Sequence, residues 1–200
     1  MDGRLREAGC WAHARHKFEE ALESEPLGAN HALVTIGQLY AVESDARERE
    51  QTGNALLARR QTETRDLLHD FRQWLDEQAA SALPKSAFGK GVGYTRRHGD
   101  ALTRFLSDPR IPPDSNLSER CLRAVAVGRN NYLFAGSDKG AETAAALYSV
   151  VTTCKLHGVD PYAYLADVLD CLCVHSSNRM PASGIRDLLP DRWTPRPAEQ

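Results

Sequence analysis

Apolar side chains recur at helical spacing along most of the chain, which predicts a mainly helical fold. The first stripe runs through Trp11, Phe18 and Leu22, and Pro26 with Gly28 is expected to end it. A second helix is expected to follow, and a third to run from about residue 55 to 83. Because residues 51–53 interrupt the pattern between these two long helices, we expect them to fold back on each other as an αα-hairpin.

Capping residues predict further helices in the second half of the chain. Ser86 is expected to cap a helix that reaches Leu106, and residues 114–116 supply capping side chains for a helix over residues 117–127. A helix of small residues is expected over 141–156, with Gly158 just beyond its end. Asp160 followed by proline predicts the start of a last helix. Strand signals are few: one short strand before Cys10 and one around residues 132–134.

The charges of the chain are balanced overall but not locally. The 25 basic and 27 acidic side chains leave a formal net charge of −2, which does not by itself indicate a protein that binds nucleic acid. Residues 81–140, however, carry 10 basic and 5 acidic side chains, a net of +5. This middle segment is the expected anion-facing surface, although a solvated basic face without a ligand would give the same count.

The densest polar cluster surrounds Glu119. It allows a structural interpretation, with Asp114 as a helix cap and Glu119 paired with Arg123 one turn on. It also allows a functional one, with Glu119 as a metal ligand and the nearby arginines placed to meet phosphates. Spacing alone favours the structural interpretation.

Four motifs in the chain are long enough to indicate a resemblance to a particular protein family. They are residues 9–18 (Gly-Cys-Trp-Ala-His-Ala-Arg-His-Lys-Phe), 114–137, 145–165 and the ending 188–190. Over about residues 8–192 the chain resembles the C-terminal part of transposases of the insertion-sequence 66 family. Departures from the family pattern fall at His16, Ser115, Ala124 and Asn130. His16 stands where the family usually has arginine, and Asn130 where it usually has lysine. The loss of these two basic side chains is expected to weaken contacts with DNA phosphates.

The resemblance implies the end of a ribonuclease-H-like α/β fold with a helical insertion and an Asp-Asp-Glu catalytic triad. Glu119 corresponds to the triad Glu and would bind Mg²⁺ together with two Asp residues that the family carries upstream of residues 9–18. We therefore expect a C-terminal fragment that is inactive alone in metal-dependent DNA strand transfer. The implied segments are 1–27 (last core strand and helix), 28–106 (helical insertion), 107–178 (Glu-bearing and C-terminal helices) and 179–200 (tail).

The resemblance also implies partners and a location. The transposon ends are the expected DNA partner, with backbone contacts from Arg120, Arg123, Arg129, Asn131 and Lys139. The expected protein partner is the missing N-terminal half or a second copy of the chain. The expected location of the protein is the cytoplasm, in association with the nucleoid, and no membrane partner is expected. The alternative function is a non-catalytic helical module for DNA binding or oligomerisation.

Cysteine and histidine side chains could be combined into a zinc site, from Cys10 and His13 and from Cys171, Cys173 and His175. Neither group has the spacing of a zinc finger, and buried thiols with a packed histidine explain them as well. No zinc is assigned from the sequence.

Overall fold

The computed structural model describes residues 6–128, 136–174 and 182–195. The chain forms two compact units, residues 1–119 and 120–200. The described residues are mainly helical and include no strand. Residues 6–10 do not form the strand expected before Cys10, and the strand expected around residues 132–134 lies outside the described residues. Within the described residues, no helix is both long enough and apolar enough to cross a lipid bilayer.

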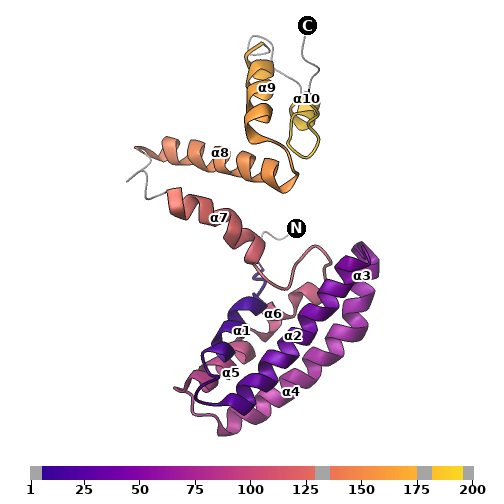
Figure 1. Cartoon of the computed structure of the whole chain (residues 1–200), viewed down its shortest axis with the longest axis vertical. Coiled ribbons are helices and arrows are strands. Elements are labelled where there is room, and N and C mark those ends of the chain that lie inside the picture. The colour runs from indigo at the N-terminus through magenta and orange to yellow at the C-terminus, as the bar shows by residue number, and fades with distance from the viewer. Residues whose placement is uncertain (1–5, 129–135, 175–181, 196–200) are drawn as a thin grey trace. The chain divides into compact units, whose positions relative to one another are not determined.

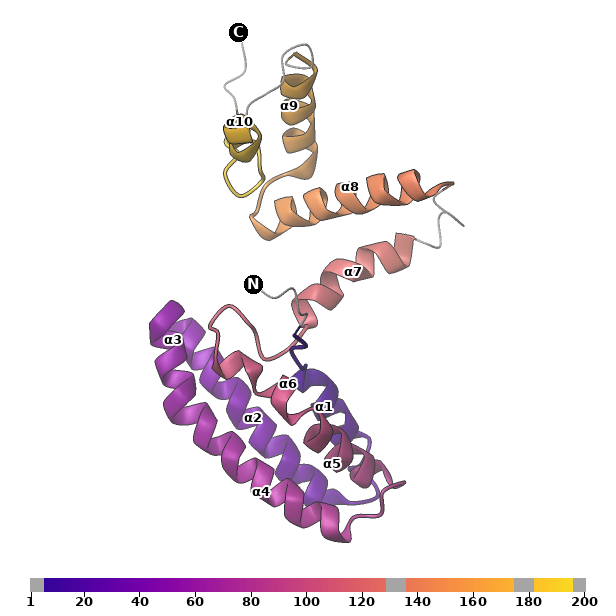
Figure 2. The same ribbon diagram turned by 180° about the vertical axis from the view of Figure 1, so that it is seen from behind.

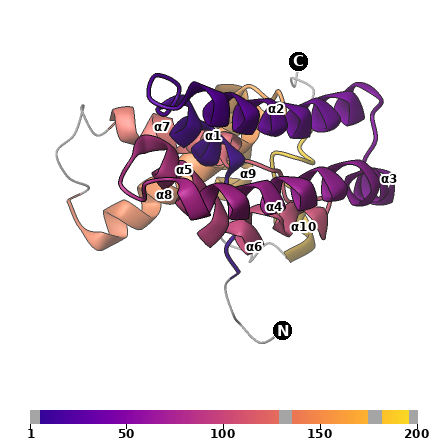
Figure 3. The same cartoon turned by 90° about the horizontal axis from the view of Figure 1, so that it is seen from below.

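The first unit is a helical bundle (Figures 1 and 2). Its elements, in chain order, are α1 (Trp11–Glu19), α2 (Pro26–Glu48), α3 (Gly53–Arg59), a π-helical turn (Arg60–Thr64), α4 (Arg65–Ser81), α5 (Ala87–Arg97), α6 (Gly99–Leu102) and a 3₁₀ turn (Arg104–Leu106). Helices α3 and α4 and the π-turn between them make one long rod that returns beside α2, as the expected αα-hairpin (Figure 3). Helix α1 packs on α2 and α5, and α5 packs on α4.

Aromatic side chains fill the centre of this bundle. Phe18 of α1 meets Phe88 of α5 edge to face with ring centres 6.1 Å apart, and Phe71 stacks on Trp74 at 5.6 Å. The aliphatic part of the core comes mainly from α2, α4, α5 and α6: Ile36, Leu39, Leu68, Leu75, Val92 and Leu102. The apolar stripes of the sequence therefore meet in one core.

Helix boundaries in this unit follow the sequence with two corrections. Pro26 does not end a helix; it is the first residue of α2, where its missing N–H is not needed and its fixed φ suits the helix. The helix capped by Ser86, whose Oγ accepts from the Gly89 N–H at 3.0 Å, ends at Arg97 instead of reaching Leu106. Beyond Arg97 the chain forms α6 and the 3₁₀ turn.

The second unit holds most of α7 (Asn116–Gly128), then α8 (Asp138–Leu156), α9 (Pro161–Val174) and α10 (Ala182–Asp187). Asp160 caps α9 by accepting hydrogen bonds from two of its first N–H groups, as the sequence predicts. Gly158 follows α8 with a φ of +68°, the left-handed conformation that glycine adopts readily.

The core of the second unit is small. Among the residues that the structure describes, its buried apolar cluster consists of Cys154, Tyr164 and Val168. Around them the Tyr164 hydroxyl donates to the Leu188 carbonyl at 2.7 Å, and the Trp193 indole N–H donates to the Asp167 carboxylate at 2.7 Å. Large apolar side chains on α7, α8 and α9 remain exposed, among them Leu122, Val127, Leu147, Tyr162 and Leu169.

Candidate functional site

The start of α1 is fixed in the first unit by close backbone packing. The Gly9 N–H donates to the Ala101 carbonyl at 2.8 Å, and the buried Trp11 donates its indole N–H to the Leu102 carbonyl at 2.9 Å. A Cβ on Gly9 would lie 2.8 Å from the backbone nitrogen of Leu102, so only glycine fits there without a shift. Cys10, which lies between Gly9 and Trp11 in the sequence, is the buried N-cap residue of α1.

The segment that leads into α7 lies against this helix start. The Trp11 N–H donates to the carbonyl of Pro113 at 3.0 Å, and the Ser115 N–H donates to Sγ of Cys10 at 3.3 Å. Asp114 accepts from the N–H of Asn116, the first residue of α7, at 3.0 Å, and so satisfies that helix N–H from the position before the N-cap residue Ser115. Two motifs that are 105 residues apart in the sequence thus meet in one place.

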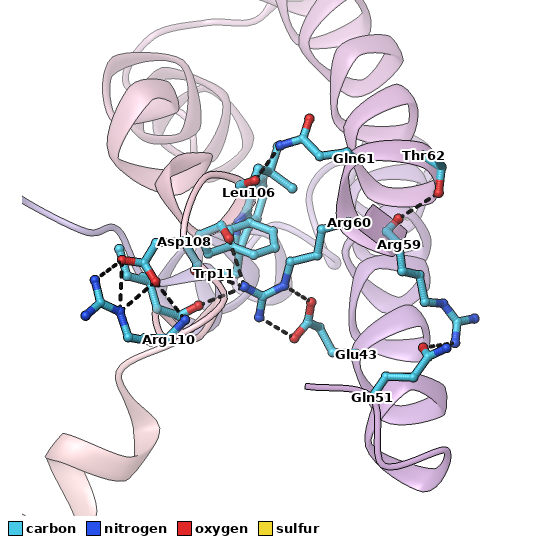
Figure 4. A network of polar contacts seen from close by, with 12 residues as sticks. Trp11, Glu43, Gln51, Arg59, Arg60, Gln61, Thr62, Leu106, Asp108 and Arg110 are labelled. Atoms are coloured by element: carbon cyan, nitrogen blue, oxygen red, sulfur yellow. Dashed lines mark hydrogen bonds and ion pairs between the residues drawn. The ribbon is translucent and has the colours of Figure 1, made fainter. Parts of the chain in front are cut away.

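A buried arginine anchors the beginning of the same segment (Figure 4). Arg60, in the π-turn, is 2% exposed and makes two hydrogen bonds to the carboxylate of Glu43, at 2.7 and 2.8 Å. Its third nitrogen donates to three backbone carbonyls, those of Phe105, Asp108 and Ile111. The sequence gives no signal for this network, because Arg60 lies in a run of polar residues typical of an exposed helix face.

Glu119 lies in the first turn of α7, directly after the segment that packs against the start of α1. Its carboxylate accepts a hydrogen bond from the Ser115 hydroxyl at 2.7 Å and lies 3.7 Å from Nε2 of His13. The structure therefore gives Glu119 different partners from the Arg123 expected from spacing. The side chains of His13 and Glu119 are 57% and 52% exposed, so the carboxylate is ordered by neighbours and open to solvent at the same time.

Three side chains with metal-binding atoms converge here. Sγ of Cys10, an imidazole nitrogen of His13 and a carboxylate oxygen of Glu119 all lie within 4.8 Å of one another. In the described part of the chain this is the one group of three or more Cys, His, Asp and Glu side chains placed so closely. Sequence reasoning singled out all three residues but did not bring them together.

A half-buried tyrosine lies beside this site. Burial, with a smaller contribution from the nearby Asp114 carboxylate, raises the pKa of Tyr40 far above its usual value of 10.0. The phenol therefore stays protonated at any ordinary pH. It borders a cavity of 350 Å³ that is also lined by Ala12, Arg15 and Glu19 of α1 and by Asn116.

The basic residues expected to meet DNA belong to the second unit. Arg120 and Arg123 are exposed on α7, three residues apart and so on one face of the helix, and Lys139 is exposed in the first turn of α8. Arg129 and Asn131 lie outside the described residues.

Comparison with known proteins places the chain among the transposases. The family model described as "Transposase IS66 family" matches residues 1–143, and the model described as "IS66 C-terminal element" matches residues 149–190. The chain belongs to the IS66 transposase family. The match covers both motifs that meet at Glu119, so the IS66 likeness and the geometry of the site concern the same residues.

Curated relatives of this IS66 chain come from Sinorhizobium fredii. The uncharacterized proteins y4hP, y4qI and y4jD are 34%, 32% and 35% identical to it, over 93%, 94% and 94% of the chain. The chain spans about a third of their length, since the matched parts are 35%, 34% and 36% of those proteins. No solved structure matches the chain. The expected ribonuclease-H-like fold therefore stays a prediction.

The IS66 resemblance implies Mg²⁺, and the described residues fit it only in part. Glu119 offers one open carboxylate, the kind of ligand that Mg²⁺ takes alongside substrate phosphates. The two groups nearest to it, the thiol of Cys10 and the imidazole of His13, are ligands for softer metals. No cluster of three carboxylates is found in residues 6–128, 136–174 and 182–195. Of the three carboxylate ligands that the resemblance implies, the described residues therefore offer a candidate for one, Glu119.

Proposed function

We propose that this chain is the C-terminal part of a DNA transposase and that Glu119 is the glutamate of an Asp-Asp-Glu triad. The observation that carries this proposal is the meeting of two family motifs around a carboxylate that is ordered by Ser115 and open to solvent. A metal ligand in phosphodiester chemistry needs both properties, since its position must be fixed while the substrate still reaches the ion.

The complete enzyme would carry out metal-dependent strand transfer at transposon ends. Bound Mg²⁺ would supply a polarised nucleophile and stabilise the leaving oxygen. The part of Glu119 in this chemistry is to hold its carboxylate toward the ion, with the Ser115 hydroxyl fixing the carboxylate orientation. On the family resemblance, the two Asp ligands belong upstream of residues 9–18, and on that ground we propose that the chain by itself is inactive.

Arg120, Arg123 and Lys139 are proposed to bind the DNA backbone. Their exposed positions on α7 and α8 suit phosphate contacts, which add affinity independently of base sequence. Arg129 and Asn131 belong to the same proposal on the strength of the family resemblance alone.

A strand-transfer assay with the purified chain tests the proposal. The chain is incubated with Mg²⁺, duplexes carrying the transposon ends and a plasmid target. We expect DNA binding that weakens with salt and no strand-transfer product. Strand transfer by the chain without a partner would contradict the proposed division of the triad. DNA binding in this assay does not separate a transposase part from a non-catalytic DNA-binding module, which is why the catalytic role of Glu119 needs its own test.

A further inference from the structure

The grouping of Cys10, His13 and Glu119 has a chemistry that Mg²⁺ binding does not use. A thiol and an imidazole together favour zinc and similar transition metals, whereas Mg²⁺ takes oxygen ligands almost exclusively. We propose that this chain binds one Zn²⁺ ion through Sγ of Cys10, Nε2 of His13 and the carboxylate of Glu119. The proposal does not depend on Glu119 being a catalytic residue.

The distances suit a tetrahedral ion. Zinc bonds of about 2.0–2.3 Å to oxygen, nitrogen and sulfur place the ligand atoms about 3.3–3.6 Å apart. The His13 nitrogen and the Glu119 oxygen are already 3.7 Å apart, and all three ligand atoms lie within 4.8 Å of one another. The imidazole and the carboxylate are both half exposed, so small side-chain rotations bring them onto a common ion without disturbing the core.

The surroundings of the three ligands resemble the outer shell of a metal site. Ser115 donates its backbone N–H to Sγ of Cys10 at 3.3 Å and its hydroxyl to Oε1 of Glu119 at 2.7 Å. One residue therefore orients two ligands, as the hydrogen-bond donors around bound metals commonly do. Cys10 is itself held between two anchored residues, since Gly9 donates to Ala101 and Trp11 donates to Leu102.

The three protein ligands leave one tetrahedral position open. Structural zinc sites use four protein ligands, whereas zinc sites with three keep a position for water or another ligand. The exposure of His13 and Glu119 places that position toward solvent. We therefore expect an exchangeable site that a chelator strips without unfolding the chain.

Metal titrations of the purified chain test the proposal. Zn²⁺ is added to the chelator-treated protein in a calorimeter, and Co²⁺ is added separately while the visible and near-ultraviolet absorption is recorded. We expect one metal ion per chain, a thiolate-to-cobalt charge-transfer band, and no displacement of zinc by millimolar Mg²⁺. A cobalt spectrum without a thiolate band, or zinc release by Mg²⁺, would overturn the proposal.

Matched variants assign the ligands. Cys10→Ser, His13→Gln and Glu119→Gln are each expected to weaken zinc binding by at least about tenfold. Cys121→Ser and His16→Gln remove the same kinds of side chain outside the cluster, the latter on α1 itself, and are expected to bind as the parent does. Circular dichroism confirms that each variant is folded. Should Cys10→Ser not fold, a cobalt thiolate band that persists in Cys171→Ser/Cys173→Ser and is lost in His13→Gln still assigns the thiolate to this site, and its loss in Cys171→Ser/Cys173→Ser would refute it. Unchanged affinity in folded Cys10→Ser would refute the site.

Discussion

The Ser115 hydroxyl donates a hydrogen bond of 2.7 Å to the carboxylate of Glu119, while the backbone N–H of the same serine donates to Cys10. Ser115 therefore links the beginning of α7 to the beginning of α1. Together with the bond from the Trp11 N–H to the Pro113 carbonyl, it joins the two parts of the candidate site.

Loss of the Ser115 hydroxyl is expected to affect metal binding more than folding. Ser115→Ala keeps the backbone donor to Cys10 and removes the donor to Glu119, so the carboxylate is less well oriented. Removal of an outer-shell donor costs about 10–100-fold in metal affinity, and we expect a loss of that order in zinc calorimetry. Ser115→Thr, which retains the hydroxyl, should bind nearly as the parent does. Equal affinities for all three proteins would show that this hydrogen bond does not tune the site.

Arg60 and Glu43 are expected to control the stability of the first unit. Arg60→Met leaves the Glu43 carboxylate buried without its partner and removes the donor to three carbonyls. Breaking a buried pair in this way costs about 3–5 kcal/mol, which urea denaturation would measure. The control Arg65→Gln, at an exposed position in the same rod, should change the free energy of unfolding little. A loss below about 1 kcal/mol in Arg60→Met would show that the network does not anchor the segment.

Two glycines should respond to alanine in opposite directions. In Gly9→Ala the new Cβ meets the Leu102 backbone, and we expect a loss of about 1–3 kcal/mol from forced displacement. In Gly37→Ala, at an exposed position inside α2, the new Cβ meets nothing within 4 Å. Helix propensity should then add about 0.5–1 kcal/mol. Thermal unfolding of both variants checks the contrast, and a stabilised Gly9→Ala would contradict the close packing.

Asp108 should make folding sensitive to acid. Hydrogen bonds from the Arg110 side chain, and then from its backbone N–H, lower the pKa of Asp108 from 3.8 to about 2. A carboxyl group whose pKa is lower in the folded state stabilises the fold above its unfolded pKa. That stabilisation is lost as the pH falls from about 4 to about 2. The difference in melting temperature between the parent and Asp108→Asn should therefore be constant above pH 4 and shrink below it. A difference that does not vary over this range would contradict the shift.

Arg123 tests the proposed DNA contacts. If it neutralises one phosphate, Arg123→Gln should weaken binding to all duplexes alike and lower the slope of log affinity against log salt by about one. Arg65→Gln, an exposed position in the acidic first third of the chain, serves as the control. Fluorescence anisotropy over a range of salt concentrations measures both. A slope that Arg123→Gln leaves unchanged would remove Arg123 from the interface.

Local sequence signals predicted much of the helical fold. The cap at Ser86, the start at Asp160 and the left-handed Gly158 are each confirmed, because each depends on residues close together in the chain. Pro26 was assigned to the wrong end of a helix, since proline fits equally well after one helix and at the first turn of the next.

The candidate site could be predicted only in part. Glu119 follows from its motif, and Cys10 and His13 from theirs, but their meeting depends on how α1 packs against the segment before α7. Arg60 was not predicted at all, because its burial depends on carbonyls more than 40 residues away in the sequence. Contacts between residues so far apart in the sequence depend on tertiary packing, which the periodicity of apolar residues along the chain does not predict.

The central claim is that Glu119 is the catalytic glutamate of a transposase to which this chain contributes the C-terminal part. Its most direct test is strand transfer by a chimaera in which this chain replaces the matching third of the relative y4hP, assayed with Mg²⁺ on duplexes carrying the transposon ends. The account predicts activity in the chimaera and its loss, by at least about a thousandfold, in the same protein with Glu119→Gln. Equal activity with and without the Glu119 carboxylate would contradict it.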